Sequence, residues 1–179
     1  ALHAAQYALA IAETSGAEHR GTLAETLMML AELLAGQVDR AQEQVDYLQQ
    51  FLQISKVPLG VDVTWSRAYE MLGDARFALH DYEAASEAYS ASLQYNPDHP
   101  WADTLHFRIA RCHYHRHDYE QTIQIIERLL HDGQPTTEAF RLHSLLGNAR
   151  FACRQYDLAQ QAYAQALEVA PPGADLDEI

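Results

Sequence analysis

The chain has 179 residues, of which 48% are hydrophobic, and its 12 basic and 25 acidic residues give a formal net charge of −13. This hydrophobic content excludes a disordered chain, and no apolar run reaches the ~18 residues of a membrane-spanning helix. Because the negative charge repels nucleic acid, we expect a protein or peptide partner, with no nucleic-acid partner and no membrane insertion.

Nine helices are predicted from the spacing of the apolar residues and from the glycine and proline breaks between them. They lie near 1–14, 20–35, 38–53, 62–79, 82–95, 101–116, 119–131, 136–153 and 156–169. Helix 1–14 is a half repeat, segment 20–53 forms a looser pair, a loop spans 53–61, and an acidic tail covers 174–179. Since the chain opens with half a pair and no polar capping helix follows the last pair, we expect a fragment of a longer protein.

A spacing of 37 residues recurs along the C-terminal part of the chain. Tyr82, Tyr119 and Tyr156 mark this spacing, and each lies between polar residues. A tiny residue lies nine positions before each tyrosine and an aromatic residue five positions before it: Gly73 and Phe77, Ala110 and Tyr114, Gly147 and Phe151. Small and aromatic residues at a fixed phase are typical of stacked repeats, so we interpret residues 1–179 as a single solenoid.

The last repeat, 137–173, resembles the tetratricopeptide repeat, a helix-turn-helix of about 34 residues. The residues that carry the resemblance are Leu146, Gly147, Phe151, Tyr156, Ala159, Tyr163, Ala166 and Pro171. Repeat 62–99 fits the same pattern. Repeat 100–136 departs from it, because it has Thr122, Ile126 and Gln134 in place of a small residue, an aromatic residue and a proline. The resemblance implies an all-α fold, a right-handed α-solenoid of stacked helix-turn-helix repeats.

Close helix packing accounts for the small residues of this pattern. They let the two helices of a pair approach each other, so Gly147 and Ala159 are expected to face each other inside the last pair. Asp81 and Asp118 directly precede second helices and are candidate N-caps.

Two sequence features point to different compartments. The linker 95–103 resembles those of bacterial envelope tetratricopeptide proteins of the outer-membrane-assembly type. The longer N-terminal units instead look like repeats of cytoplasmic regulatory proteins. The cytoplasm and the bacterial periplasm therefore both stay open.

The resemblance also implies that first helices line a concave groove and second helices form a convex back. The first-helix segments hold eight arginines and five acidic residues, a net charge of +3, over 62–80, 101–117 and 136–154. The second-helix and linker segments hold one arginine, Arg128, and thirteen acidic residues, a net charge of −12, over 81–100, 118–135 and 155–179. A basic inner face would attract acidic or amphipathic peptides. In the alternative interpretation, these arginines pack their stems and pair with neighbouring acids.

Nine residues at or beside the family's groove positions are our candidate peptide-binding residues. They are Arg67, Asp74, Phe77, Phe107, Arg111, Tyr114, Arg141, Asn148 and Phe151. Other groove positions fall on Glu70, Ala78, Thr104, His115, Ser144 and Ala152. The aromatic residues of this set can equally belong to the core. The family's carboxylate clamp needs Lys and Asn at set positions; Asn148 is the only matching Asn and the three repeats lack Lys, so no such clamp is predicted.

A metal site is considered because the chain has ten histidines. His113 and His117 share a helix face at i, i+4 spacing, with His106 on the same stripe, and such a pair could hold Zn²⁺ or Ni²⁺. Further ligands are missing from the pattern, since Asp118 belongs to the turn. We therefore interpret these histidines as packing or solvated residues and predict no metal.

Cys112 and Cys153 are interpreted as two small buried residues.

No Gly-rich phosphate loop, nucleophile elbow or His-Glu-x-x-His pattern is present, so we expect neither an enzyme nor a cofactor. The leading hypothesis is a protein–protein interaction scaffold that binds a peptide or a partner domain in the concave groove, favouring acidic or amphipathic ligands. Two alternatives stay open. One is a homo-oligomerisation module that associates through its bare terminal helix. The other is an accessory interaction segment of a larger enzyme or regulator.

Overall fold

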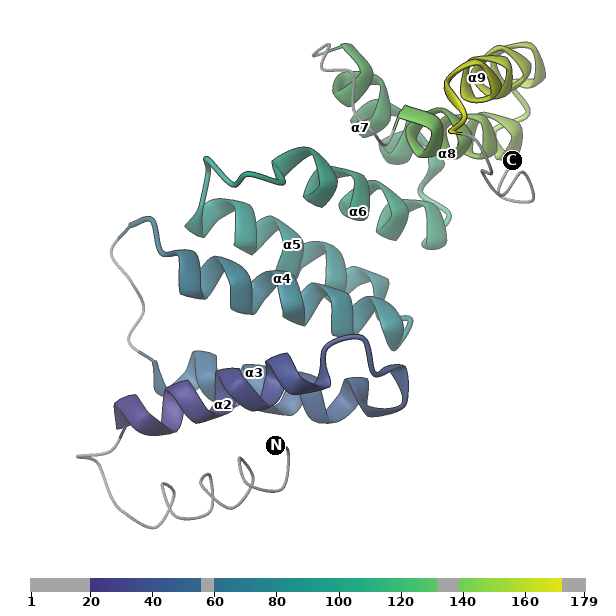
Figure 1. Ribbon diagram of the computed structural model, residues 1–179. Coiled ribbons are helices and arrows are strands. Elements are labelled where there is room, and N and C mark those ends of the chain that lie inside the picture. The colour runs from purple at the N-terminus through teal and green to yellow at the C-terminus, as the bar shows by residue number, and fades with distance from the viewer. Residues whose placement is uncertain (1–19, 56–59, 132–138, 172–179) are drawn as a thin grey trace. The chain divides into compact units, whose positions relative to one another are not determined.

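The computed structural model describes residues 20–55, 60–131 and 139–171, and every regular element among them is a helix (Figure 1). The predicted all-α fold is therefore confirmed. None of the described helices combines the length and the low polarity needed to cross a bilayer. The chain divides into two compact units, residues 1–102 and residues 103–179, which are treated separately below. The predicted helix at 1–14 and the tail at 174–179 lie outside the described residues.

The first unit contains two helical hairpins. Its elements are α2 (Arg20–Leu34), a 3-10 turn η2 (Val38–Arg40), α3 (Ala41–Ile54), α4 (Val63–Ala78) and α5 (Tyr82–Tyr95). The predicted helix 38–53 thus begins as a 3-10 turn, a common form at a helix N-terminus. Gly36, with a φ of 78°, makes the turn before it. The helices α2 and α3 pack together, as do α3 and α4, and α4 lies beside α5 (Figure 1).

Side-chain caps and an aromatic cluster fix the second hairpin of this unit. Asp62 accepts a hydrogen bond from the backbone N–H of Trp65 at 2.9 Å. Asp81 caps α5 by accepting from the backbone N–H of Ala84 at 3.3 Å, as the sequence predicted. The Trp65 ring lies 5.1 Å from that of Tyr95, centroid to centroid, within a core that also contains Leu27, Leu30, Leu48, Phe51 and Met71. These contacts join the looser N-terminal pair to the first regular repeat.

The second unit contains α6 (Ala102–His115), α7 (Tyr119–His131), α8 (Ala139–Ala152) and α9 (Tyr156–Val169). Its core gathers apolar residues from all four helices: Phe107 and Ala110, Ile126, Leu142, Leu145 and Leu146, and Ala162. The helices α7 and α8 pack together, and α8 and α9 form the last hairpin. The boundaries agree with the predicted helices to within three residues, and residues 132–138 before α8 lie outside the described part.

Two hairpins have a glycine packed against a tyrosine ring. A Cβ added to Gly147 would lie 2.9 Å from Cζ of Tyr163 and closer still to Cδ1 and Cε1. Gly73 has the same relation to Tyr89. The atoms closest to Gly147 thus belong to Tyr163, and a direct contact between Gly147 and Ala159 stays a prediction. Close approach, rather than conformational freedom, requires glycine at these two helical positions.

In the middle repeat, other residues occupy the positions of this glycine and this tyrosine. Ala110 occupies the glycine position and Ile126 the tyrosine position, and both are fully buried. Both belong to the core of the second unit, and isoleucine is smaller than the tyrosine of the other two repeats. Thr122, which replaces the expected small residue, is also fully buried, and its hydroxyl group lies 3.0 Å from the Asp118 carbonyl oxygen and 3.3 Å from that of Ala110. Thr122 and Ile126 are therefore both accommodated in the core, while Gln134 lies outside the described residues.

The turns inside the three regular repeats share a left-handed residue that is not glycine. His80, His117 and Arg154 have φ values of 61°, 63° and 61°. In each turn the following backbone N–H bonds back to a carbonyl five residues earlier, as Gln155 does to Arg150 at 2.9 Å. This is the Schellman geometry that normally favours glycine. Three strained residues are thus retained at the repeat period.

Replacement of Arg154 by glycine should stabilise the protein, because a left-handed backbone costs a non-glycine residue roughly 1–2 kcal/mol. The greater freedom of glycine in the unfolded chain offsets part of that gain. Urea unfolding should show a higher midpoint for Arg154→Gly and a lower one for Gln161→Gly, which places glycine in the middle of α9. A lower midpoint for both variants would show that the strain at Arg154 is not a cost to stability.

Candidate functional site

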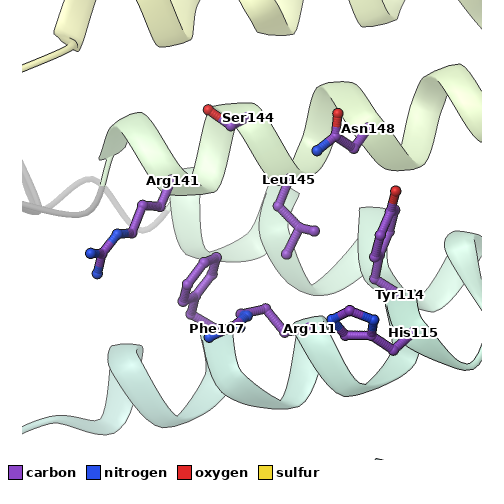
Figure 2. A pocket seen from close by; sticks show the side chains of 8 residues that line it. All are labelled: Phe107, Arg111, Tyr114, His115, Arg141, Ser144, Leu145 and Asn148. Carbon is purple, nitrogen blue, oxygen red and sulfur yellow. The ribbon is translucent and has the colours of Figure 1, made fainter. Parts of the chain in front are cut away.

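The second unit has a cavity of about 510 Å³ between α6 and α8 (Figure 2). Eight residues line it: Phe107, Arg111, Tyr114 and His115 from α6, and Arg141, Ser144, Leu145 and Asn148 from α8. Their spacing explains why they meet, since residues three, four and seven positions apart share one face of a helix. The cavity therefore follows from two first helices turned toward each other.

The helix α6 contributes two aromatic rings, Phe107 and Tyr114, and two polar side chains, Arg111 and His115. Figure 2 shows Phe107 and Tyr114 rising from α6 toward α8, with Arg111 between them. Phe107 is buried and Tyr114 is half-buried, whereas Arg111 and His115 are exposed. Burial raises the pKa of the Tyr114 hydroxyl above its ordinary value, and the nearby Tyr119 adds to the shift. Tyr114 therefore stays protonated at neutral pH and can donate a hydrogen bond.

The α8 side places one apolar group between polar ones. The Leu145 side chain descends from α8 into the cavity, and Arg141 extends beside Phe107 (Figure 2). Ser144 is buried and donates its hydroxyl proton to the Phe140 carbonyl at 2.8 Å. Asn148 accepts a hydrogen bond on Oδ1 from the Tyr163 hydroxyl at 2.8 Å. Arg141 lines the cavity from the first turn of α8, and its side chain is exposed.

The charge of this lining is positive, in contrast to the chain as a whole. Two of the eight residues are arginines and none is acidic, while the full sequence has a net charge of −13. The lining side chains offer hydrogen-bond donors beside an apolar surface formed by Phe107 and Leu145. Such a cavity suits a ligand that combines an anionic group with an apolar one.

Five of the nine predicted site residues line this cavity. They are Phe107, Arg111, Tyr114, Arg141 and Asn148. Whether they bind a ligand stays a prediction.

The structure gives the other four predicted site residues contacts within the chain. Arg67 pairs with Glu32 at 2.9 Å, and Asp74 accepts a hydrogen bond from Tyr89 at 2.8 Å. The ring centroids of Phe77 and Tyr82 lie 5.2 Å apart, and those of Phe151 and Tyr156 lie 5.4 Å apart. The same turn pairing occurs between Tyr114 and Tyr119 at 5.5 Å, so the recurring aromatic residue packs across each turn. Only Tyr114 combines this packing with a place in the cavity described above.

Several first-helix arginines follow the alternative interpretation, in which they pair with acids. Arg67 contacts Glu32, Arg76 contacts Asp81 at 3.0 Å, and Arg150 contacts Glu127 at 2.6 Å. These pairs reduce the positive charge that a simple count assigns to the first helices. Three first-helix arginines are therefore balanced by acidic neighbours, while two others, Arg111 and Arg141, line the cavity.

Leu145 is a cavity residue that the sequence analysis missed. It lies four positions after Arg141 and three before Asn148, and it also contributes to the core of the unit. Its helical spacing from two predicted site residues could have identified it. Because an apolar residue on a first helix also fits a purely structural role, that spacing alone carried no binding signal. His115 and Ser144 were groove positions of the family but were not among the nine candidates.

The histidines considered as metal ligands have separate partners. His113 Nδ1 lies 3.2 Å from Asp118 Oδ2, and His117 Nδ1 lies 2.7 Å from the Tyr119 hydroxyl. Burial, with a smaller contribution from Arg128, lowers the pKa of His106. Within residues 20–55, 60–131 and 139–171, no group of three His, Cys, Asp or Glu side chains could hold a metal ion. Cys112 is buried, Cys153 is half-buried, and both are free thiols.

Comparisons with known proteins agree on the architecture. Two family models, both described as tetratricopeptide repeat, match residues 76–146 and 140–172. No curated protein sequence gives a significant match.

Similar solved structures span most of the chain at low sequence identity. A Podosopora anserina protein of the kinesin light chain type, with nearly identical TPR-like repeats, has a TM-score of 0.75 at 16% identity, covering 94% of this chain and 84% of its own. The crystal structure of MamA has a TM-score of 0.65 at 19% identity, covering 82% and 77%. BtubC (BKLC) from P. vanneervenii has a TM-score of 0.65 at 16% identity, covering 99% and 75%. At these identities the likeness establishes the fold alone.

Proposed function

We propose that this chain, which belongs to the tetratricopeptide repeat family, is a protein-interaction scaffold. Its peptide-binding site lies between α6 and α8. Two family models together cover residues 76–172, and these include all four helices of the second unit. Proteins built from such repeats bind protein partners through surfaces that the stacked helices create. The proposal gives the chain a binding role without chemistry of its own.

The observation that carries this proposal is the polarity of the cavity. Arg111 and Arg141 supply positive charge, and no acidic side chain occurs among the eight lining residues. Phe107 and Leu145 supply an apolar floor beside them. A peptide with an aspartate or glutamate next to an apolar anchor satisfies both features. The site is open and partly exposed, so modest affinity that weakens with salt is expected.

Selection from an unbiased peptide library tests this proposal. The immobilised protein should enrich peptides that carry an acidic residue within a few positions of an aromatic or aliphatic residue. Isothermal titration of the enriched peptides should show weaker binding as salt rises, because exposed charges are screened over about 8–10 Å at physiological ionic strength. Enrichment of basic peptides, or no enrichment at all, would reject the proposal.

Self-assembly is a second candidate function, favoured by exposed apolar side chains at the last hairpin. Phe151, Tyr156, Leu158, Leu167 and Val169 are between 42% and 58% exposed. Four of them are on α9, where they flank the buried stripe of Ala159, Ala162 and Ala166. Exposed apolar groups gathered on one element often mark a contact surface.

A charge introduced on both flanks of α9 tests self-assembly. Sedimentation velocity should show concentration-dependent association of the parent protein, because association would remove the apolar side chains from water. The double variant Leu158→Glu/Leu167→Glu should remain monomeric over the same range, whereas Val38→Glu, which alters an exposed residue of the first unit, should associate like the parent. A parent protein that is monomeric at every concentration would exclude this candidate.

A further inference from the structure

The amide of Asn148 is held by a residue outside the cavity. Its Oδ1 accepts a hydrogen bond from the Tyr163 hydroxyl of α9 at 2.8 Å, while Asn148 itself lines the cavity between α6 and α8. In Figure 2 the Asn148 oxygen points away from α6, and the amide nitrogen lies on the side of Leu145. Among the described residues, the amide nitrogen has no hydrogen-bond partner. The N–H₂ group is therefore the part of Asn148 that a ligand can use.

A tyrosine at the same repeat position in the first unit also donates a hydrogen bond from its hydroxyl group. Tyr89 lies 74 residues before Tyr163, at the same place in its repeat, and its hydroxyl donates to Asp74 Oδ1 at 2.8 Å. An ionised carboxylate can only accept, so the hydroxyl must donate in that pair. Burial also raises the pKa of Tyr163, with a smaller contribution from Tyr114, so its proton is retained at neutral pH. By this parallel the Asn148 oxygen is occupied and its nitrogen is turned away from α9.

The middle repeat has no tyrosine hydroxyl to make this hydrogen bond. Ile126 occupies the tyrosine position and has no hydroxyl group, and the residue at the place of Asp74 and Asn148 is Arg111. An arginine side chain is a donor in every orientation, whereas an asparagine can present either a donor or an acceptor. A hydrogen-bond partner is therefore needed to decide whether Asn148 presents its donor or its acceptor to the cavity. Arg111 presents donors without one.

We propose that Tyr163 is a positioning residue, which locks the Asn148 amide so that the cavity presents only donors at this corner and selects a carboxylate over a carboxamide. This inference rests on the proposed peptide-binding function and adds the source of its specificity. With Tyr163 in place, Asn148 Nδ2, Arg111 and Arg141 can all donate to the oxygens of a glutamate or aspartate side chain. A glutamine or asparagine would bring its own N–H₂ group against these donors, which leaves donors unpaired and weakens binding.

The variant Tyr163→Phe tests the inference because it removes one oxygen atom and leaves the ring that packs on Gly147. The probes are an acidic peptide enriched from the library and the same peptide with its glutamate or aspartate changed to glutamine or asparagine. The parent protein should favour the acidic peptide by about tenfold or more, the usual scale for hydrogen bonds to a charged group. In Tyr163→Phe this preference should fall severalfold, since the freed amide can present its oxygen to the carboxamide peptide. Tyr89→Phe, which removes the same hydroxyl from the first unit, should keep the parent preference.

Nuclear magnetic resonance gives a second readout that a merely structural role would not move. In the parent protein the Asn148 side-chain N–H₂ signals should shift when the acidic peptide is added, and in Tyr163→Phe they should broaden or double as the amide samples two orientations. An unchanged preference and unchanged signals in Tyr163→Phe would overturn the inference while leaving peptide binding intact. Failure of the parent protein to bind the acidic peptide would instead overturn the proposed function and this inference with it.

Discussion

Replacement of Gly147 by alanine should destabilise the protein, although alanine ordinarily stabilises a helix by about 1 kcal/mol relative to glycine. The added Cβ would lie within 2.9 Å of the Tyr163 ring, so either the ring or the backbone of α8 must shift. Tyr163 cannot move freely, because its hydroxyl is bound to Asn148 and its helix packs on α8. Overpacking of this kind typically costs roughly 1–3 kcal/mol. Thermal and urea unfolding should both show the loss.

Two further variants establish the cause of that loss. Gly21→Ala is the matched control, because a Cβ at Gly21 meets nothing within 4 Å, and this variant should be neutral or slightly stabilising. The double variant Gly147→Ala/Tyr163→Ile should recover much of the stability, because it recreates the buried Ala110 and Ile126 pair of the middle repeat. If Gly147→Ala is as stable as the parent protein, the close approach of α8 to Tyr163 described here is wrong.

The repeat period made the fold predictable from the sequence. Because Tyr82, Tyr119 and Tyr156 fix the phase of each repeat, the helix boundaries could be placed to within three residues. The Asp81 cap followed from residue type and position alone. Helix boundaries and caps depend on residues close together in the sequence, so they can be predicted without knowing the angles at which the helices pack. The packing around Gly147 does depend on the crossing angle, so the sequence did not identify the close approach of the Tyr163 ring.

Repeat position identified part of the cavity lining, but it did not show which groove residues pair within the chain instead. Arg111 and Arg141 were identified by their positions in the repeat, and both line the cavity. Arg67 occupies a comparable position, but Glu32 lies opposite it, 35 residues away in the sequence and inside the looser N-terminal pair. Because that pair follows no strict repeat pattern, no sequence signal announced the contact. Repeat position alone therefore does not reveal a long-range ion pair such as that of Arg67 with Glu32.

The orientation of Asn148 shows a further limit of sequence reasoning. An asparagine at a groove position predicts a polar contact, but not whether it donates or accepts. The hydrogen bond from Tyr163, fifteen residues later in the chain, supplies that information. The polarity of the cavity thus depends on the second helix of the hairpin, which contributes none of the eight lining residues.

Reversal of charge at the centre of the cavity should have the largest effect on binding. Arg111 lies between Phe107 and Tyr114 on α6, so a glutamate at this position would place a negative charge beside the anionic group of a bound peptide. Repulsion then replaces attraction, and we expect the Kd of library-selected acidic peptides to rise at least about tenfold, or about 1.4 kcal/mol. Arg141→Glu should have a comparable effect. Fluorescence anisotropy with labelled peptides, at low and at physiological salt, measures both.

The control is Arg128→Glu, which makes the same change in net charge on α7, a helix that contributes no residue to the cavity. Arg128 is exposed, so its effect on binding should be limited to a weak, salt-screened change in the overall field. The difference between Arg111→Glu and Arg128→Glu should also shrink as salt rises, because direct contacts in an open site are partly screened. Melting curves of the variants must first show that the fold is retained. Equal losses for Arg111→Glu and Arg128→Glu would mean that total charge governs binding, and the cavity between α6 and α8 would then lose its role as the peptide site.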